Sequence, residues 1–258
     1  MGPALGATLL AALGGFLCLW LVSVARRDAS IVDPFWGLGF VIVAGVAASQ
    51  GPGGSRAGLA LLLVATWGLR LSAYLTWRAW GQPEDFRYRA MRDKHGPRFW
   101  WISGLTVFTL QAALCWIIAL PVQAAILVGG DAGWLDGLGA LVFAAGFAIE
   151  AVADAQLARF KARRTDPEAI LDTGVWAWSR HPNYFGELVV WWGLGLVGLA
   201  AGAWWALVGP AVISGLLLRV SGVPLLEAKL RQRPAFRAYV ERTPAFFPRP
   251  PRSTRSAR

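Results

Sequence analysis

The sequence is poor in cysteine, histidine and charged side chains. Its 258 residues include two cysteines and two histidines, and 16% of them are Asp, Glu, Lys or Arg. Cys18 and Cys115 have no CxxC spacing and lie inside apolar runs. They are therefore predicted to pack as small apolar residues, and neither a structural disulfide nor a zinc site is expected.

Nucleotide-binding and hydrolase motifs are also missing. No GxGxxG, Walker, HExxH or GxSxG pattern stands in a suitable context. No βαβ unit is predicted, which excludes dinucleotide binding through a Rossmann fold. Any cofactor site must therefore be built from helices.

Long hydrophobic runs dominate the chain instead. The mean hydropathy is +0.47 and 56% of the residues are hydrophobic, which is more than one soluble core can bury. Lipid-exposed strands would leave backbone groups unpaired, so helices are expected. Recurring small residues, such as Gly193 and Gly198, predict close approach between these helices. The runs near the roughly 20 residues that cross a bilayer are 4–25, 35–50, 57–80, 102–128, 133–157, 185–202 and 203–223.

Basic residues gather in alternate connectors between these runs. They are frequent at 26–27, 78–101 and 159–184 and from Lys229 onward, whereas the other connectors carry few. Because Lys and Arg near span ends prefer the cytoplasm, the N-terminus is predicted outside and the C-terminus inside. The net charge of +10 is then a topology signal, and nucleic-acid binding is not expected.

The predicted fold is an all-α polytopic membrane protein with about seven transmembrane helices. The first run lacks a basic leading region and ends in Arg26-Arg27, so it is expected to be a retained span and not a cleaved signal peptide. One transmembrane domain is predicted over 1–250. The basic tail 251–258 is expected to be disordered, with at most weak contacts to anionic headgroups.

Ionisable side chains inside apolar runs are functional candidates, because burying them in a bilayer costs several kcal/mol. Asp33 and Pro34 open the second run. They are expected to mark a helix start, with Asp33 as N-cap and proline at the first helical position. Alternatively, Asp33 donates a proton to a buried substrate. Arg70 and Tyr74 lie one turn apart on the third run. Arg70 is expected either to pair with Asp33 or Glu150 or to bind a phosphate or carboxylate group.

A second set of charges lies later in the chain. Glu150 and Asp154 share a helix face at i, i+4 spacing, and two like charges there need a shared partner. Pairing with Lys161 or its basic neighbours explains Asp154 better than Glu150. Arg219 in the last run and Glu227 after it are likewise difficult to justify at membrane depth without a function.

The most specific pattern enters the sixth apolar run. Five polar residues crowd a predicted helix start, where backbone N–H groups and the helix dipole favour anions. Asn183 and Glu187 lie one turn apart on that helix. The five residues are Arg180, His181, Asn183, Tyr184 and Glu187.

Three segments resemble a known family. Ser-Arg-His-Pro-Asn-Tyr-Phe-Gly-Glu at 179–187, with the segments 150–161 and 237–248, is similar to the bacterial relatives of the steroid 5-alpha-reductases. The likeness spans about residues 30–250. Its Arg-His-Pro-x-Tyr element is shared with isoprenylcysteine carboxyl methyltransferases and sterol reductases, so it identifies the superfamily better than the reaction.

The resemblance implies a multi-pass reductase of the bacterial inner membrane. Such an enzyme carries hydride from NADPH to the enone C=C bond of a lipid-like substrate, typically a 3-oxo-Δ4 steroid, and needs no metal and no obligate protein partner. Asp33 and Trp67 occupy the positions of the family's catalytic acid and tyrosine, and Glu227 is closer to the methyltransferase-like pattern. The residues expected at the cofactor are Arg70, Tyr74, Glu150, Asp154, Lys161, Arg164, Arg180, His181, Asn183, Tyr184, Glu187, Arg219 and Glu227.

In the resulting hypothesis the basic inner face holds the cofactor phosphates, and Asn183 and Glu187 orient its nicotinamide or ribose end. A protonated Asp33 hydrogen-bonds the substrate ketone and stabilises its enolate character. One alternative is an S-adenosylmethionine-dependent methyltransferase that acts on a lipid or a prenylcysteine carboxylate. The other is a transporter or membrane scaffold, which predicts a polar path at the midplane.

Overall fold

The structure is a computed structural model that describes residues 1–250 apart from residues 167 and 221. The predicted disordered tail, 251–258, lies outside the described residues. Every regular element in the described part is helical, which confirms the all-α prediction. By its internal contacts the chain separates into two units, unit 1 at 1–137 with 194–209 and unit 2 at 138–193 with 210–258.

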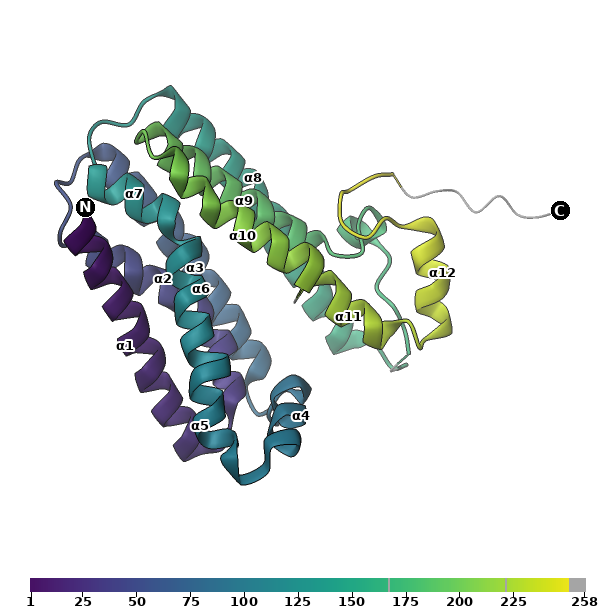
Figure 1. The fold of residues 1–258 in the computed structure, drawn as a ribbon. Coiled ribbons are helices and arrows are strands. Elements are labelled where there is room, and N and C mark those ends of the chain that lie inside the picture. The colour runs from purple at the N-terminus through teal and green to yellow at the C-terminus, as the bar shows by residue number, and fades with distance from the viewer. Residues whose placement is uncertain (167, 221, 251–258) are drawn as a thin grey trace. The chain divides into compact units, whose positions relative to one another are not determined.

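The helices follow one another along the chain with short connections (Figure 1). The first part of the chain holds α1 Gly2–Arg26, η1 Ala29–Ile31, α2 Val32–Ala48, α3 Ser55–Ala79, α4 Phe86–His95, η2 Gly96–Arg98, α5 Phe99–Ser103, η3 Gly104–Thr109, α6 Leu110–Ile118 and α7 Leu120–Val128. The later part holds α8 Trp134–Arg163, η4 Gly174–Ala177, α9 Pro182–Ala200, η5 Trp204–Leu207, α10 Val208–Gly215, η6 Leu216–Val220, α11 Val223–Leu230 and α12 Pro234–Arg242.

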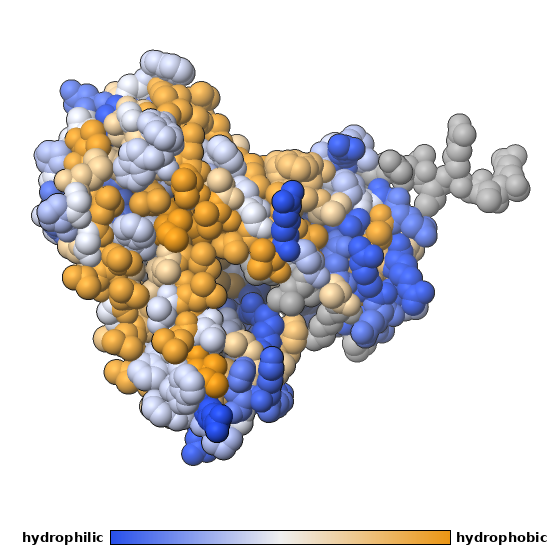
Figure 2. All heavy atoms as spheres, viewed as in Figure 1, coloured by the Kyte–Doolittle hydropathy of each residue, from blue (hydrophilic) through white to orange (hydrophobic). Residues whose placement is uncertain are grey.

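Five helical stretches within the described residues are long and apolar enough to cross a membrane. Large hydrophobic side chains remain exposed on them, as at Leu10, Leu62 and Leu141 with 70%, 63% and 71% of their surface accessible, and Figure 2 shows such side chains in orange. Apolar surface on this scale suits contact with lipid. The stretches are Gly2–Arg26, Ala29–Ala48, Ser55–Ala79, Phe86–Ile118 and Trp134–Arg163.

Two boundaries differ from those expected. The apolar run 102–128 is divided, because α6 ends at Ile118 and α7 begins at Leu120 with Pro121 in its first turn. Proline lacks the N–H that would continue the helical ladder of α6, and its fixed φ suits a helix start. The second run begins earlier than expected, with Ile31 as the N-cap of α2, so Asp33 lies inside the first turn.

Unit 1 is organised around α2, which packs against both α1 and α3. The α2–α3 crossing depends on glycine. A Cβ at Gly37 would lie 2.3 Å from the carbonyl oxygen of Gly68, and a Cβ at Gly68 would lie 2.5 Å from that of Gly37. The Ser72 hydroxyl accepts a hydrogen bond from the Leu38 N–H at 2.8 Å. The two helices therefore meet backbone to backbone.

In unit 2, glycines likewise allow the backbones of α8 and α9 to meet. A Cβ at Gly146 would lie 2.6 Å from the Val190 nitrogen, and one at Gly186 would lie 2.6 Å from the Glu150 nitrogen. Gly193 is equally close to the backbone of Phe143, at 2.5 Å. The close helix approach predicted from small residues is confirmed here, and it places α8 directly against the first turns of α9.

Candidate functional site

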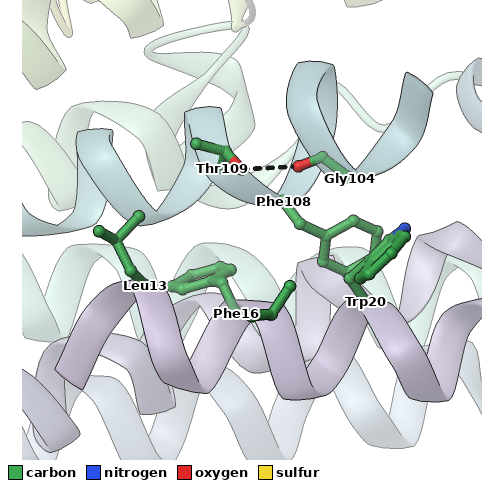
Figure 3. A pocket seen from close by; sticks show the side chains of 7 residues that line it. Leu13, Phe16, Trp20, Gly104, Phe108 and Thr109 are labelled. Carbon is green, nitrogen blue, oxygen red and sulfur yellow. Dashed lines mark hydrogen bonds between the residues drawn. The ribbon is translucent and has the colours of Figure 1, made fainter. Parts of the chain in front are cut away.

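A hollow in unit 1 is too small for a coenzyme. It lies where Leu13, Phe16 and Trp20 of α1 face Phe108 and Thr109 of η3 (Figure 3). Its volume of about 20 Å³ is room for about one water molecule. Its lining is mostly apolar, so it offers few groups that would orient a ligand. The polar residues of unit 2 offer more such groups.

Arg180 fixes the loop that leads into α9. Its guanidinium is 7% exposed, and its Nε donates to Glu227 Oε1 at 2.8 Å. The Nη1 group donates to the carbonyl oxygen of Thr243 at 2.5 Å, and the Arg180 backbone N–H donates to Pro244 O at 2.9 Å. A planar guanidinium suits several fixed acceptors at once, so this side chain is held by internal partners.

Glu227 is the counter-charge of this loop. Besides Arg180 it binds His181 Nε2 at 3.2 Å and Arg231 Nη2 at 3.2 Å. Burial raises the pKa of the Glu227 carboxyl, but the hydrogen bonds from His181 and Arg180 outweigh burial and lower this pKa to about 2. Glu227 is therefore ionised at neutral pH and fastens α11 to the loop before α9.

The end of the chain is fastened to the same loop. The hydroxyl of Tyr239 donates to Trp176 O, Ser179 Oγ donates to Phe246 O at 2.7 Å, and the backbone N–H of Arg249 donates to Trp178 O at 2.9 Å. Burial raises the pKa of the Tyr239 hydroxyl, which keeps it a donor. We call residues 234–250 the C-terminal strap. The strap holds the loop 176–181 that positions the start of α9.

The first turn of α9 faces buried acids on α8. Glu150 and Asp154 are 3% and 5% exposed, and Asn183 Nδ2 donates a long hydrogen bond of 3.4 Å to Asp154 Oδ1. The rings of His181 and Tyr184 stack, with centroids 5.7 Å apart and planes within 6°. The structure thus brings together Asn183 and Asp154, two residues that were predicted as site residues from separate features of the sequence.

The other predicted cations of unit 2 lie at its surface, unlike Arg180. Lys161 and Arg164 are exposed at the C-terminal end of α8 and just beyond it, and Arg219 is exposed within the π-helical segment η6. A rise of about 1.5 Å per residue puts Lys161 roughly 10 Å along the helix from Asp154. Buried carboxylates and exposed cations therefore follow one another along α8.

Unit 1 contains the other four predicted residues. Trp67 is fully buried and its ring lies 5.5 Å from that of Phe40 in an edge-on contact, so it packs the helix core. Arg70 and Tyr74 are half-buried on α3.

Asp33 has partners that the sequence did not reveal. Its Oδ1 accepts from the Tyr88 hydroxyl at 2.7 Å, and its Oδ2 accepts from Arg87 at 2.5 Å. Arg87 in turn binds Asp85 at 2.8 Å. A carboxyl group whose two oxygens both accept hydrogen bonds, one of them from a cation, has the contacts typical of an ionised carboxylate. The predicted protonated form could keep Arg87 at Oδ2, but its Oδ1 would then donate to the Tyr88 hydroxyl instead of accepting from it.

A family described as "Protein of unknown function (DUF1295)" matches residues 19–243. The chain belongs to the DUF1295 family. Over 283 aligned positions this DUF1295 protein is 27% identical to an uncharacterized protein of Schizosaccharomyces pombe, and the alignment covers 90% of the chain and 76% of the relative. No solved structure matches the chain.

The DUF1295 match contains every residue predicted for the site, from Asp33 to Glu227. It also contains Arg87 and Tyr88, which only the structure connects to Asp33. Among the described residues, no group of three or more His, Cys, Asp and Glu side chains is arranged to hold a metal ion.

Proposed function

We propose that this DUF1295 protein is an NADPH-dependent membrane reductase that acts on the enone C=C bond of a steroid-like lipid. The observation that carries the proposal is the polar contact between α8 and α9. Glu150 and Asp154 are buried acids of α8, and Asp154 accepts from Asn183 of α9. Ionisable groups are costly at membrane depth, which marks them as functional candidates. The association of the family with steroid 5-alpha-reductase-like proteins supports the same conclusion.

The residues present fit the nicotinamide riboside end of the cofactor better than its phosphate end. Asn183, Asp154 and Glu187 offer amide and carboxylate groups that would bind the amide and hydroxyl groups of the nicotinamide riboside. Lys161 and Arg164 are exposed and would hold phosphates as cations. Arg180 is already held by Glu227 and by backbone carbonyls. Its role in the proposal is to position the start of α9.

NADPH, when bound, supplies the hydride. The protein's own part is to hold the cofactor at the start of α9 and to orient the substrate carbonyl. We propose seven membrane-crossing helices with the N-terminus outside and the C-terminus in the cytoplasm of a bacterial cell, so that the basic end of α8 faces the cytosolic cofactor. The apolar substrate then enters from the lipid.

Ligand-induced stabilisation tests this proposal. The protein purified in detergent is expected to unfold at a higher temperature with NADPH than with NADH, because a ligand that binds only the folded state stabilises it by mass action. The variant Asn183→Leu should lose most of this shift, whereas Arg237→Gln on the exposed face of α12 should keep it. An unchanged unfolding temperature with NADPH contradicts the proposal.

A methyltransferase is the second function to test. A glutamate at position 227 is closer to the methyltransferase-like pattern, and Glu227 binds both Arg180 and His181. In that case S-adenosylmethionine raises the unfolding temperature and NADPH does not. The same titration series therefore separates the two functions.

Substitution of Asp33 separates its two possible roles. Asp33→Asn keeps the volume but loses the charge that Arg87 binds, so we expect a loss of about 1–2 kcal/mol of stability for this partly exposed pair. If Asp33 also polarises the substrate carbonyl, turnover of an enone steroid should fall far more than this loss explains, with NADPH stabilisation retained. Arg87→Gln should reproduce the loss of stability, and full turnover in Asp33→Asn would exclude the catalytic role.

A further inference from the structure

One end of unit 1 concentrates exposed aromatic side chains. Trp77 lies in the last turn of α3 and Trp80 caps that helix, Phe86 begins α4, and Trp100 and Trp101 lie in α5. Their exposed fractions are 64%, 80%, 47%, 54% and 44%. The end of α1 belongs to the same region, since its Trp20 donates to the Trp100 carbonyl at 2.7 Å. Figure 1 shows α4 beside α5 at this end. We call residues 77–101 the α4 platform.

Two of the three acids of the α4 platform, Glu84 and Asp85, are engaged in contacts within unit 1, whereas the third, Asp93, is exposed. Glu84 accepts from the Ala29 N–H at 2.8 Å and from Arg92 at 2.8 Å. Burial raises the pKa of Glu84, but the bonds from Arg92 and Ala29 outweigh it and lower the pKa. Asp85 binds Arg87, which also binds Asp33 at the start of α2. These contacts neutralise Arg87 and Arg92 and clamp the α4 platform onto α2.

The remaining cations of the α4 platform face outward. Arg78, Arg89, Lys94 and Arg98 are exposed, and none of them takes part in an ion pair within the described part of the chain. Hydrophilic side chains accordingly colour this end of unit 1 blue in Figure 2. The outer face thus combines a cationic surplus with large aromatic rings.

We propose that the α4 platform binds the headgroups of anionic phospholipids in the leaflet where α3 and α5 leave the bilayer. Tryptophan rings favour the depth of the headgroups, and Lys and Arg near the surface attract anionic lipids. Trp77 and Trp101 sit within or beside membrane-crossing stretches, so the bilayer surface passes through the platform. A nucleic acid or an acidic protein would instead leave these rings in water.

Lipid-dependent stability tests this assignment with the full-length protein. In nanodiscs of phosphatidylcholine, addition of phosphatidylglycerol should raise the unfolding temperature of the wild type. The triple variant Arg78→Gln, Lys94→Gln, Arg98→Gln should lose most of this rise and keep the wild-type value in pure phosphatidylcholine. A control triple with the same change of charge in unit 2, Arg163→Gln, Arg237→Gln, Arg249→Gln, should retain the rise.

Three outcomes overturn the proposal. The first is a rise that survives in the platform triple, and the second is an equal loss in both triples, which indicates a general effect of net charge. The third is an equal rise with glycerol phosphate in detergent, which indicates a soluble phosphoester site. A bimane label at Ala90→Cys, made in a Cys18→Ser background because Cys18 is exposed, adds an independent readout. Lipids that carry a quencher near the headgroup should quench the label more strongly than those quenched deep in the chain.

Discussion

Glu227→Gln is expected to cost about 3–5 kcal/mol of stability, because it leaves the buried guanidinium of Arg180 without its counter-charge. Arg180 is 7% and Glu227 is 6% exposed at the side chain, so water cannot replace the lost partner. The amide keeps the volume of Glu227, which isolates the effect of charge. Unfolding temperatures at a fixed scan rate in detergent measure the change.

The control for this prediction is Glu241→Gln, which removes an exposed acid from α12. Its effect is expected to stay within about 0.5 kcal/mol, as for most surface substitutions. Equal unfolding temperatures for the two variants would show that the pair adds nothing to the fold.

The same pair predicts a pH dependence. Because the folded state lowers the pKa of Glu227 from 4.5 to about 2, the folded state binds the proton less readily than the unfolded chain. The stabilisation is complete above pH 4.5 and is lost as the pH falls toward 2. The difference in stability between the wild type and Glu227→Gln should therefore decrease as the pH falls from 4.5 toward 2, and it should be constant above pH 4.5.

Gly186→Ala is expected to destabilise unit 2 by about 2–3 kcal/mol. Its Cβ would lie 2.6 Å from the Glu150 nitrogen and 2.7 Å from the Gly146 oxygen. Both are backbone atoms, so α8 and α9 must separate instead of a side chain turning aside. The bond between Asn183 and Asp154 is already 3.4 Å long, and any NADPH stabilisation should fall with it.

The matched control is Gly137→Ala on α8, where a Cβ meets nothing within 4 Å. Alanine there should be neutral or slightly stabilising, because it has the higher helix propensity. Gly146→Ala should repeat the destabilisation from the α8 side. If Gly186→Ala and Gly137→Ala unfold alike, the helices do not depend on this contact.

The sequence was sufficient to predict most of the helical segments. Apolar runs expected at 57–80 and 133–157 correspond to Ser55–Ala79 and Trp134–Arg163, because length and composition alone decide what can cross a bilayer. Gly193 and Gly198 do allow close backbone approach, as expected. The break at Pro121 was missed because the surrounding run is uniformly apolar and masks the proline. The number of membrane crossings and their orientation stay predictions.

The candidate site was less predictable, since its contacts join distant parts of the chain. Asn183 and Asp154 were both selected as polar residues at helix ends, but spacing does not reveal which acid faces which amide. The partners of Asp33 are 54 and 55 residues away, and nothing local distinguishes Arg87 from other cations of its loop. Periodicity reports on one helix, whereas these pairs depend on how helices pack.

The ion pair between Arg180 and Glu227 forms late in biosynthesis relative to the synthesis of Arg180. The two residues are 47 positions apart, and at about 5–20 residues per second the ribosome needs roughly 2–10 s to add the second after the first. During that interval the loop before α9 carries a cation whose carboxylate does not yet exist. The nascent chain must therefore keep this loop hydrated, and the contact between the loop and α11 can close only after Glu227 has been added.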